Sequence, residues 1–124
     1  MAGELILIVE DNERNRKLVR DVLQFKGYQT LDAETGEDGV RLARERRPAL
    51  ILMDIQLPGI DGITALGQLR SDPLTRGIPV IAVTASAMTH DRQKILAAGF
   101  DGYQTKPIRV QEFLEAVRRM LERV

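Results

Sequence analysis

Short apolar runs alternate with segments of helical periodicity along the whole chain, and this alternation restricts the possible folds more than any other feature. Leu5–Val9 and Leu50–Met53 are continuous, β-rich apolar runs, as expected for parallel strands that are covered on both faces. The clearest helical stripe lies near the carboxyl terminus, with the spacing i, i+3, i+4, i+7, i+11, i+14: Val110, Phe113, Leu114, Val117, Leu121 and Val124.

The other expected elements continue the same alternation. Further strands are predicted at Tyr28–Leu31, Pro79–Val83 and, more weakly, Gly102–Gln104. Further helices are predicted through Leu18–Leu23 with a stop at Gly27, through Val40–Ala43 ending before Pro48, through Ile63–Leu69, and over Thr89–Ala98 with a stop at Gly99. This pattern predicts an α/β fold, a single (βα)5 doubly wound parallel sheet with right-handed crossovers and helices on both faces.

Size and composition agree with one domain over residues 1–124. A chain of 124 residues and 13.9 kDa has the commonest domain size, and 44% apolar residues are enough for a core without disulfides or a structural metal. Cysteine is absent, which excludes thiolate catalysis, cysteine-ligated zinc and disulfides.

Charge and hydropathy exclude two classes of partner. Lys and Arg together number 18, as do Asp and Glu, so no overall positive field attracts nucleic acid. The longest apolar runs have five or six residues, whereas about 20 are needed to span a bilayer. The amino terminus also lacks the basic region of a signal peptide, so we expect a cytoplasmic protein that binds neither nucleic acid nor membrane.

Polar side chains that can bind ligands or take part in a reaction follow four of the five expected strands. In an open parallel sheet, ligands bind outside the carboxyl ends of the strands, so these residues are best considered together. Glu10 and Asp11 follow the first strand, Asp54 the third, Thr84 the fourth and Lys106 the fifth. The sequence therefore predicts that three carboxylates, a hydroxyl and an ammonium group meet in one crevice.

Each of these residues has a simpler explanation when taken alone. Asp11 or Asn12 could cap the first helix, Thr84 could cap the fourth, and Lys106 could be a solvated surface cation. Together, however, three carboxylates repel one another and raise one another's pKa, so the cluster needs a cation. One lysine compensates too little, whereas Mg²⁺ accepts one or two carboxylates together with water and phosphate oxygens.

A crevice of this kind suits phosphoryl chemistry. Mg²⁺ and Lys106 on opposite sides would neutralise the charge of a transferring phosphoryl group. Glu10 and Asp11 are adjacent and can share the metal, which leaves Asp54, from a separate strand, as the nucleophile.

Four motifs now carry a family resemblance: V-E-D-N at 9–12, L-M-D-I-Q-L-P-G-I-D-G at 52–62, V-T-A at 83–85 and K-P at 106–107. Over essentially its whole length the chain resembles CheY-like response-regulator receiver domains. Within that family, the strings M-D-I-Q-L-P, V-T-A-S-A-M and K-P-I resemble the DivK type of stand-alone receiver, which has no output domain. The resemblance implies the strand order 2-1-3-4-5, with a switch point between strands one and three.

The resemblance also implies the roles of the acids. Asp54 would accept a phosphoryl group from a phosphohistidine. Mg²⁺ would be held by Asp11, Asp54 and the backbone carbonyl of Gln56, with Glu10 acting on the metal through water. Many family members have Asp where this chain has Glu10, a common change that should not disable metal binding.

Further implied roles belong to residues near the last two strands. Lys106 and Thr84 would contact the phosphoryl oxygens, and Tyr103 would be the aromatic residue that moves when Thr84 does. The Lys106–Pro107 bond is expected to be cis. The implied partners are a histidine kinase or a histidine phosphotransfer protein, which would dock near the first helix. An effector would bind the face formed by the helix at Thr89–Ala98, the strand at Gly102–Gln104 and the last helix.

Two other functions remain open on the residues alone. A small Mg²⁺-dependent phosphatase with an aspartate nucleophile also uses Asp54, but that class needs a second acid two residues later, where this chain has Gln56. A flavodoxin-like FMN carrier needs a first loop that cradles phosphate, and Glu10 and Asp11 would repel that group. We therefore expect a signalling switch rather than an enzyme.

Overall fold

The computed structural model describes residues 3–85 and 89–122, and over these it contains five strands and five helices in strict alternation. In chain order the elements are β1 (Leu5–Val9), α1 (Glu13–Phe25), β2 (Gln29–Ala33), α2 (Gly36–Arg46), β3 (Leu50–Asp54), α3 (Gly62–Arg70), β4 (Val80–Thr84), α4 (Thr89–Ala97), β5 (Gly102–Thr105) and α5 (Val110–Glu122).

All neighbouring strands are parallel, and the sheet order is β2-β1-β3-β4-β5. This confirms the predicted (βα)5 doubly wound α/β fold and the strand order implied by the resemblance. From β1 the chain moves outward to β2 and then returns past β1 to β3. The loops that follow β1 and β3 therefore diverge to opposite faces of the sheet and leave a crevice at their carboxyl ends.

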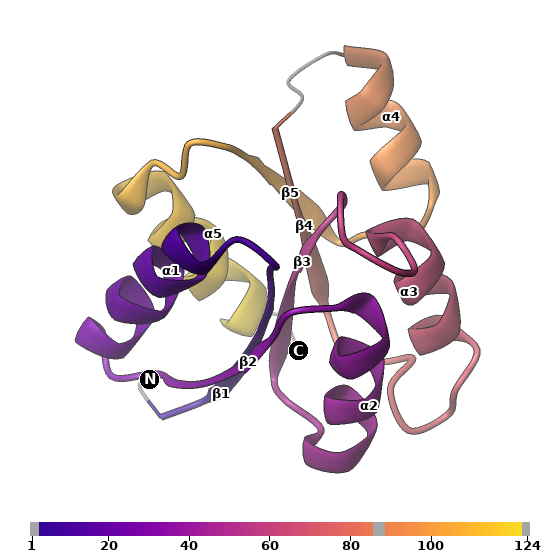
Figure 1. Ribbon diagram of the computed structural model, residues 1–124. Coiled ribbons are helices and arrows are strands. Elements are labelled where there is room, and N and C mark those ends of the chain that lie inside the picture. Colours follow the sequence, from indigo (N-terminus) through magenta and orange to yellow (C-terminus); the bar gives the residue numbers. More distant parts are fainter. Residues whose placement is uncertain (1–2, 86–88, 123–124) are drawn as a thin grey trace.

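Helices cover both faces of the sheet, with α1 and α5 on one side and α2, α3 and α4 on the other (Figure 1). The interior strands β3 and β4 are buried at every position, which explains why their sequences are continuous apolar runs without alternation. The edge strands β2 and β5 are only partly buried. Each face has its own apolar core, centred on Leu66 and Leu69 under α3 and on Phe113 and Val117 under α5.

Asn12 caps α1, and its side-chain oxygen accepts a hydrogen bond of 3.0 Å from the backbone N–H of Asn15. The capping role considered for Asp11 therefore belongs to its neighbour. The cap considered for Thr84 is also wrong, because Thr84 is the last residue of β4 and Ala85, which follows it, is not helical. At the other end of α1, Gly27 adopts a φ of 92°, a left-handed conformation that ends the helix as predicted.

Some boundaries differ from the sequence-based expectation. β2 starts after Tyr28, because the Tyr28 N–H bonds to the Leu23 carbonyl in the turn that closes α1. β4 starts after Pro79, which offers the ladder only its carbonyl, an acceptor for Ile51 N at 3.0 Å. Val110, in the first turn of α5, is 42% exposed, and Val124 lies outside the described residues.

Among the described helices, none combines the length and the apolar character that crossing a membrane requires.

Candidate functional site

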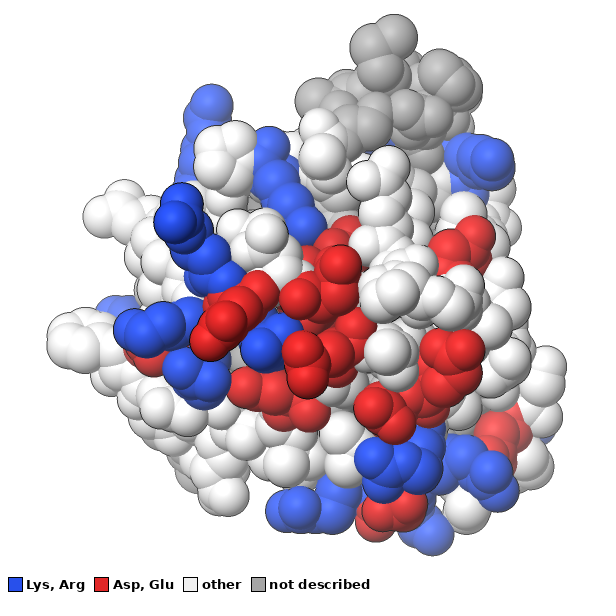
Figure 2. All heavy atoms as spheres, viewed as in Figure 1, with Lys and Arg blue, Asp and Glu red and all other residues white. Residues whose placement is uncertain are grey.

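Three acidic side chains meet where β1 and β3 end, as the sequence predicts. Glu10 and Asp54 are buried, at 5% and 4% exposure, while Asp11 is exposed to solvent. One carboxylate oxygen from each residue lies within 4.8 Å of the other two. Figure 2 shows acidic side chains gathered in the middle of this face, with Lys and Arg side chains beside them over α1. The crevice therefore concentrates negative charge at the switch point of the sheet.

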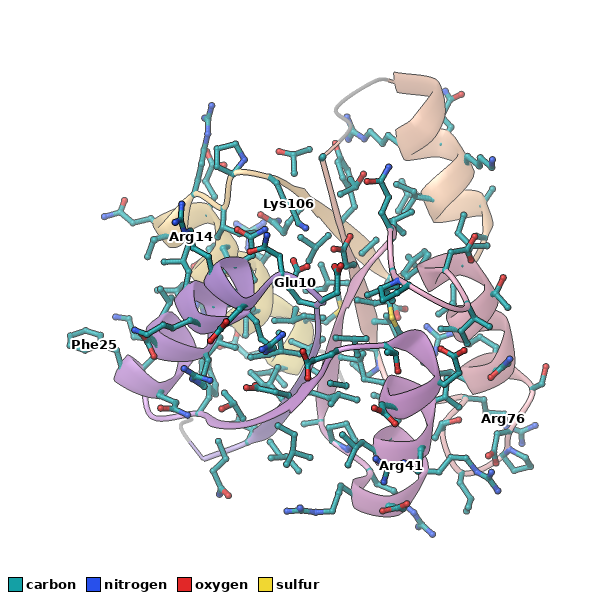
Figure 3. All side chains as sticks on the ribbon, viewed as in Figure 1. Glu10, Arg14, Phe25, Arg41, Arg76 and Lys106 are labelled. Atoms are coloured by element: carbon teal, nitrogen blue, oxygen red, sulfur yellow. The ribbon has the colours of Figure 1, made fainter. Side chains whose placement is uncertain are left out.

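Lys106 crosses the crevice and pairs with two of the acids. Its Nζ lies 2.8 Å from Glu10 Oε1 and 2.9 Å from Asp54 Oδ2. Figure 3 shows the Glu10 and Lys106 side chains pointing toward each other. The Lys106 N–H donates to the Thr84 carbonyl at 2.8 Å, and the Lys106–Pro107 bond is cis. With its side chain only 21% exposed, Lys106 is an internal ion-pair partner, so the alternative of a solvated surface cation is wrong.

The remaining oxygens of the two buried acids accept backbone hydrogen bonds. Asp54 Oδ1 accepts from the Gln56 N–H at 3.0 Å, and Glu10 Oε2 accepts from the Asn12 N–H at 3.2 Å. Each carboxylate is thus held between the Lys106 ammonium and an N–H of the loop that follows its own strand. Charge-assisted contacts of this kind fix the orientation of both groups.

Burial is the largest single influence on the pKa values of Glu10 and Lys106. The pKa of Glu10 is raised to about 7 in all: burial is the largest cause and the neighbouring Asp54 adds to it, while the hydrogen bonds from Lys106 and the Asn12 N–H oppose the rise. Burial also lowers the pKa of Lys106, but the hydrogen bonds to Glu10 and Asp54 outweigh it, so that pKa stands above the ordinary value of a lysine. A protonated lysine therefore faces a carboxyl group that resists ionisation, which means that one lysine does not fully compensate the acids.

The donor set of this cluster fits a small hard cation. Three carboxylates provide oxygen ligands and excess negative charge, which suits Mg²⁺ and offers a soft metal neither thiolate nor imidazole. The backbone carbonyl of Gln56 belongs to the loop that follows Asp54, next to the same crevice. The chemistry of these residues thus agrees with the magnesium site that the sequence predicts.

Thr84 and Tyr103 lie on the α2–α4 side of the sheet. Thr84 is buried at the end of β4, two residues after the core residue Ala82, and therefore lies on the same face of the strand. Tyr103 pairs in register with Ala82 and packs against the core under α3 and α4. The Arg92 guanidinium of α4 lies 5.1 Å from the centre of the Tyr103 ring, in cation–π range. Tyr103 thus connects β5 with α4 and does not belong to the acid cluster.

Two contacts beside the site were not predicted from the sequence. Arg16 of α1 donates to the Glu10 carbonyl, and Asp32 of β2 pairs with Arg20. The signal for Asp32 was its place near the carboxyl end of a strand, but the predicted strand stopped too early, at Leu31. Arg16 carried no such signal, because it is one of several basic residues on α1.

We predict that Asp11→Asn weakens Mg²⁺ binding by at least about tenfold while leaving the metal-free fold as stable as before, or more stable. The substitution removes a metal ligand and also relieves repulsion among the acids, and the helix cap stays with Asn12. Thermal unfolding with increasing Mg²⁺ measures both effects. Asn12→Ala is the control, which should cost about 1 kcal/mol without metal. A metal-free Asp11→Asn protein that is as destabilised as Asn12→Ala would contradict the assignment.

The comparisons with known proteins agree with this geometry. The family model for the response regulator receiver domain matches residues 6–118. The polar-differentiation response regulator DivK of Brucella anthropi is 47% identical over 116 residues, which are 94% of each chain, and its counterpart in Brucella melitensis is equally similar.

Solved structures show the same similarity. The receiver domain of a sensor histidine kinase from Pseudomonas aeruginosa, with magnesium coordinated in its active-site cleft, matches with a TM-score of 0.91 at 36% identity, covering 98% of this chain and all of that one. A response regulator of Chloroflexus aurantiacus matches with a TM-score of 0.93 at 30% identity, over 98% and 99% of the two chains. The fold, the acid crevice and these relatives together show that the chain belongs to the response regulator receiver domain family of two-component signalling.

Proposed function

We propose that residues 1–124 work as one receiver domain in which Asp54 accepts a phosphoryl group from a phosphohistidine. The observation that supports this most is the position of Asp54: it is buried at the end of β3, with Oδ2 on Lys106 and Oδ1 on the Gln56 N–H. In the transfer, a carboxylate oxygen of Asp54 forms a bond to phosphorus while the phosphorus–nitrogen bond breaks. The imidazole leaves with the electron pair of that bond.

The acids around Asp54 provide the setting for this transfer. Asp11, Asp54 and the Gln56 carbonyl would hold Mg²⁺, with Glu10 acting through water, and the oxygen donors within 4.8 Å of one another support that assignment. When bound, Mg²⁺ supplies positive charge that offsets the repulsion between the acids and an incoming phosphoryl group. The relative from Pseudomonas aeruginosa carries magnesium in its own active-site cleft.

Lys106 and Thr84 are proposed to contact the oxygens of the phosphoryl group once it is on Asp54. In the unphosphorylated protein, Lys106 pairs with both Glu10 and Asp54. Phosphorylation would replace one of these carboxylate contacts by a contact with a phosphoryl oxygen. Thr84 is tied to Lys106 through a backbone hydrogen bond of 2.8 Å, which supports a joint movement of the two residues. A shift of Thr84 would reach Tyr103 because both lie on the α2–α4 face of the sheet.

The output of the switch is proposed to be a changed protein-binding surface. Tyr103 and Arg92 join β5 to α4, so movement of the tyrosine ring would alter the face formed by α4, β5 and α5. The protein would thus catalyse only its own phosphorylation and dephosphorylation. The alternatives gain no support, because position 56 offers an exposed amide rather than an acid and the first loop offers acids to a phosphate.

Phosphorylation by a small donor tests the proposal directly. The full chain is incubated with acetyl phosphate, or with an autophosphorylated histidine kinase, with Mg²⁺ or with a chelator. The modified residue is then located by borohydride reduction of the acyl phosphate and peptide mass spectrometry. We expect Asp54 to be labelled in the samples with Mg²⁺ and to stay unlabelled in the samples with the chelator. Label on another residue, or equal labelling with the chelator, would contradict the proposal.

We further predict that donor and effector use separate faces. Arg14 projects from the first turn of α1 beside the crevice (Figure 3). Arg92 of α4, by contrast, lies over the Tyr103 ring. Because the donor histidine must reach Asp54, Arg14→Glu should slow phosphotransfer from a kinase several-fold and leave labelling by acetyl phosphate unchanged. Arg92→Glu should spare both and weaken effector binding. If Arg14→Glu and Arg92→Glu are both folded and each weakens phosphotransfer from the kinase and effector binding equally, the two-face arrangement is contradicted.

A further inference from the structure

Arg16 is held under the acid cluster rather than in solvent. Its side chain is 13% exposed, and Nη1 donates a hydrogen bond of 2.9 Å to the backbone carbonyl of Glu10. The same guanidinium lies 3.8 Å from Asp32 Oδ2 and 3.8 Å from Glu34 Oε1. One arginine of α1 therefore connects the end of β1 with the acidic end of β2.

The carbonyl that Arg16 binds has a particular place in the chain. It belongs to the peptide unit between Glu10 and Asp11, the two consecutive acids of the site. On the preceding side, the Glu10 N–H donates to the Ala33 carbonyl at 2.9 Å. β2 and Arg16 thus fix the backbone on both sides of Glu10, and the direction of this peptide determines where the two carboxylates point.

We propose that Arg16 is a positioning residue: by holding the Glu10–Asp11 peptide it orients both carboxylates for Mg²⁺. This inference rests on the proposed function, because it assumes that these acids bind the metal. Partners that orient metal ligands commonly contribute a factor of about 10 to 100 in metal affinity.

Charge alone predicts the opposite result. Arg16 carries a positive charge next to three acids, so its removal would, by electrostatics only, attract a cation more strongly. Arg20 provides the matched control, because it belongs to the same helix and binds Asp32 at 3.1 Å, while its other ion pair is with Asp21. Arg20→Gln removes an equal charge from the same acidic neighbour.

The test is calorimetric titration of the full chain with Mg²⁺ alone, with circular dichroism to show that each variant is folded. We expect Arg16→Gln to bind Mg²⁺ about tenfold more weakly, and Arg16→Lys, which keeps the charge and one donor group, to recover part of that loss. Arg20→Gln should bind as tightly as the unchanged protein or more tightly. In metal-free samples, the NMR amide signals of Asp11 and Asn12 should shift in Arg16→Gln and stay in place in Arg20→Gln.

Three outcomes would overturn the inference. Unchanged or tighter binding by Arg16→Gln would reduce Arg16 to an electrostatic role, and an equal loss in Arg20→Gln would assign the effect to the shared acidic neighbour. Absence of Mg²⁺ binding by the unchanged protein would overturn the metal site of the proposed function and this inference with it. If Arg16→Gln does not fold, Arg16→Lys carries the comparison, and affinity equal to that of the unchanged protein would again contradict the orientation role.

Discussion

Asp54→Asn is expected to abolish labelling by acetyl phosphate, the largest change in function that any single substitution here should cause. Asparagine keeps the shape of aspartate but offers a neutral amide in place of the anionic nucleophile. Lys106 keeps Glu10 as a partner at 2.8 Å, so the crevice retains one of its two ion pairs and the fold should persist. Labelling is measured by intact mass, and folding by circular dichroism.

A matched control for this substitution lies at the end of the loop that follows Asp54. Asp61 caps α3, and its Oδ1 accepts a hydrogen bond of 2.7 Å from the Thr64 N–H. Asparagine caps helices as well as aspartate does, so Asp61→Asn changes charge by the same amount at a neighbouring site and should leave labelling intact. Full labelling of folded Asp54→Asn would place the acceptor on another residue, and loss of labelling in both variants would indicate a general charge effect.

The apolar pattern of each strand was clearer the more deeply the strand is buried. β3 and β4 are covered on both faces, so their apolar runs located them to within a residue. β2 and β5 lie at the edges of the sheet and are partly exposed, so their patterns were weaker. The predicted β2 ended two residues too early, at Leu31, whereas the predicted β5 was short by one residue. Strand order came from the family resemblance, because periodicity reports which face of an element is buried and says nothing of its neighbours.

The site followed the same logic. The rule that ligands bind at the carboxyl ends of parallel strands predicted from the sequence that Glu10, Asp11 and Asp54 lie close together, as they do in the structure. The double ion pair of Lys106 could not be foreseen in the same way, because it depends on the path of the loop between β5 and α5. The contact of Arg16 could not be predicted without the angle between α1 and β1, because that angle determines which arginine of the helix reaches the Glu10 carbonyl.

Gly62→Ala should be the most damaging small substitution for stability. A Cβ at this position would clash with the Asp54 carbonyl oxygen and lie 2.9 Å from Ile55 Cα, and these backbone atoms cannot rotate away. The Gly62 N–H also donates to the Ile55 carbonyl at 3.0 Å, so the start of α3 is fixed against the end of β3. We expect a loss of about 1–3 kcal/mol in the free energy of unfolding. Labelling should slow, because relief of the clash displaces Asp54.

Gly67→Ala should change stability in the opposite direction. Gly67 lies in the same helix and is exposed, and a Cβ there would meet nothing within 4 Å. Alanine in place of an exposed helical glycine stabilises by about 0.5–1 kcal/mol, because it restricts the unfolded chain. Urea unfolding of both variants gives the two signs, and labelling by acetyl phosphate should fall only for Gly62→Ala. Destabilisation of similar size in both would mean that replacing any glycine of α3 is costly. The close contact between Gly62 and the acceptor strand would then not be the cause.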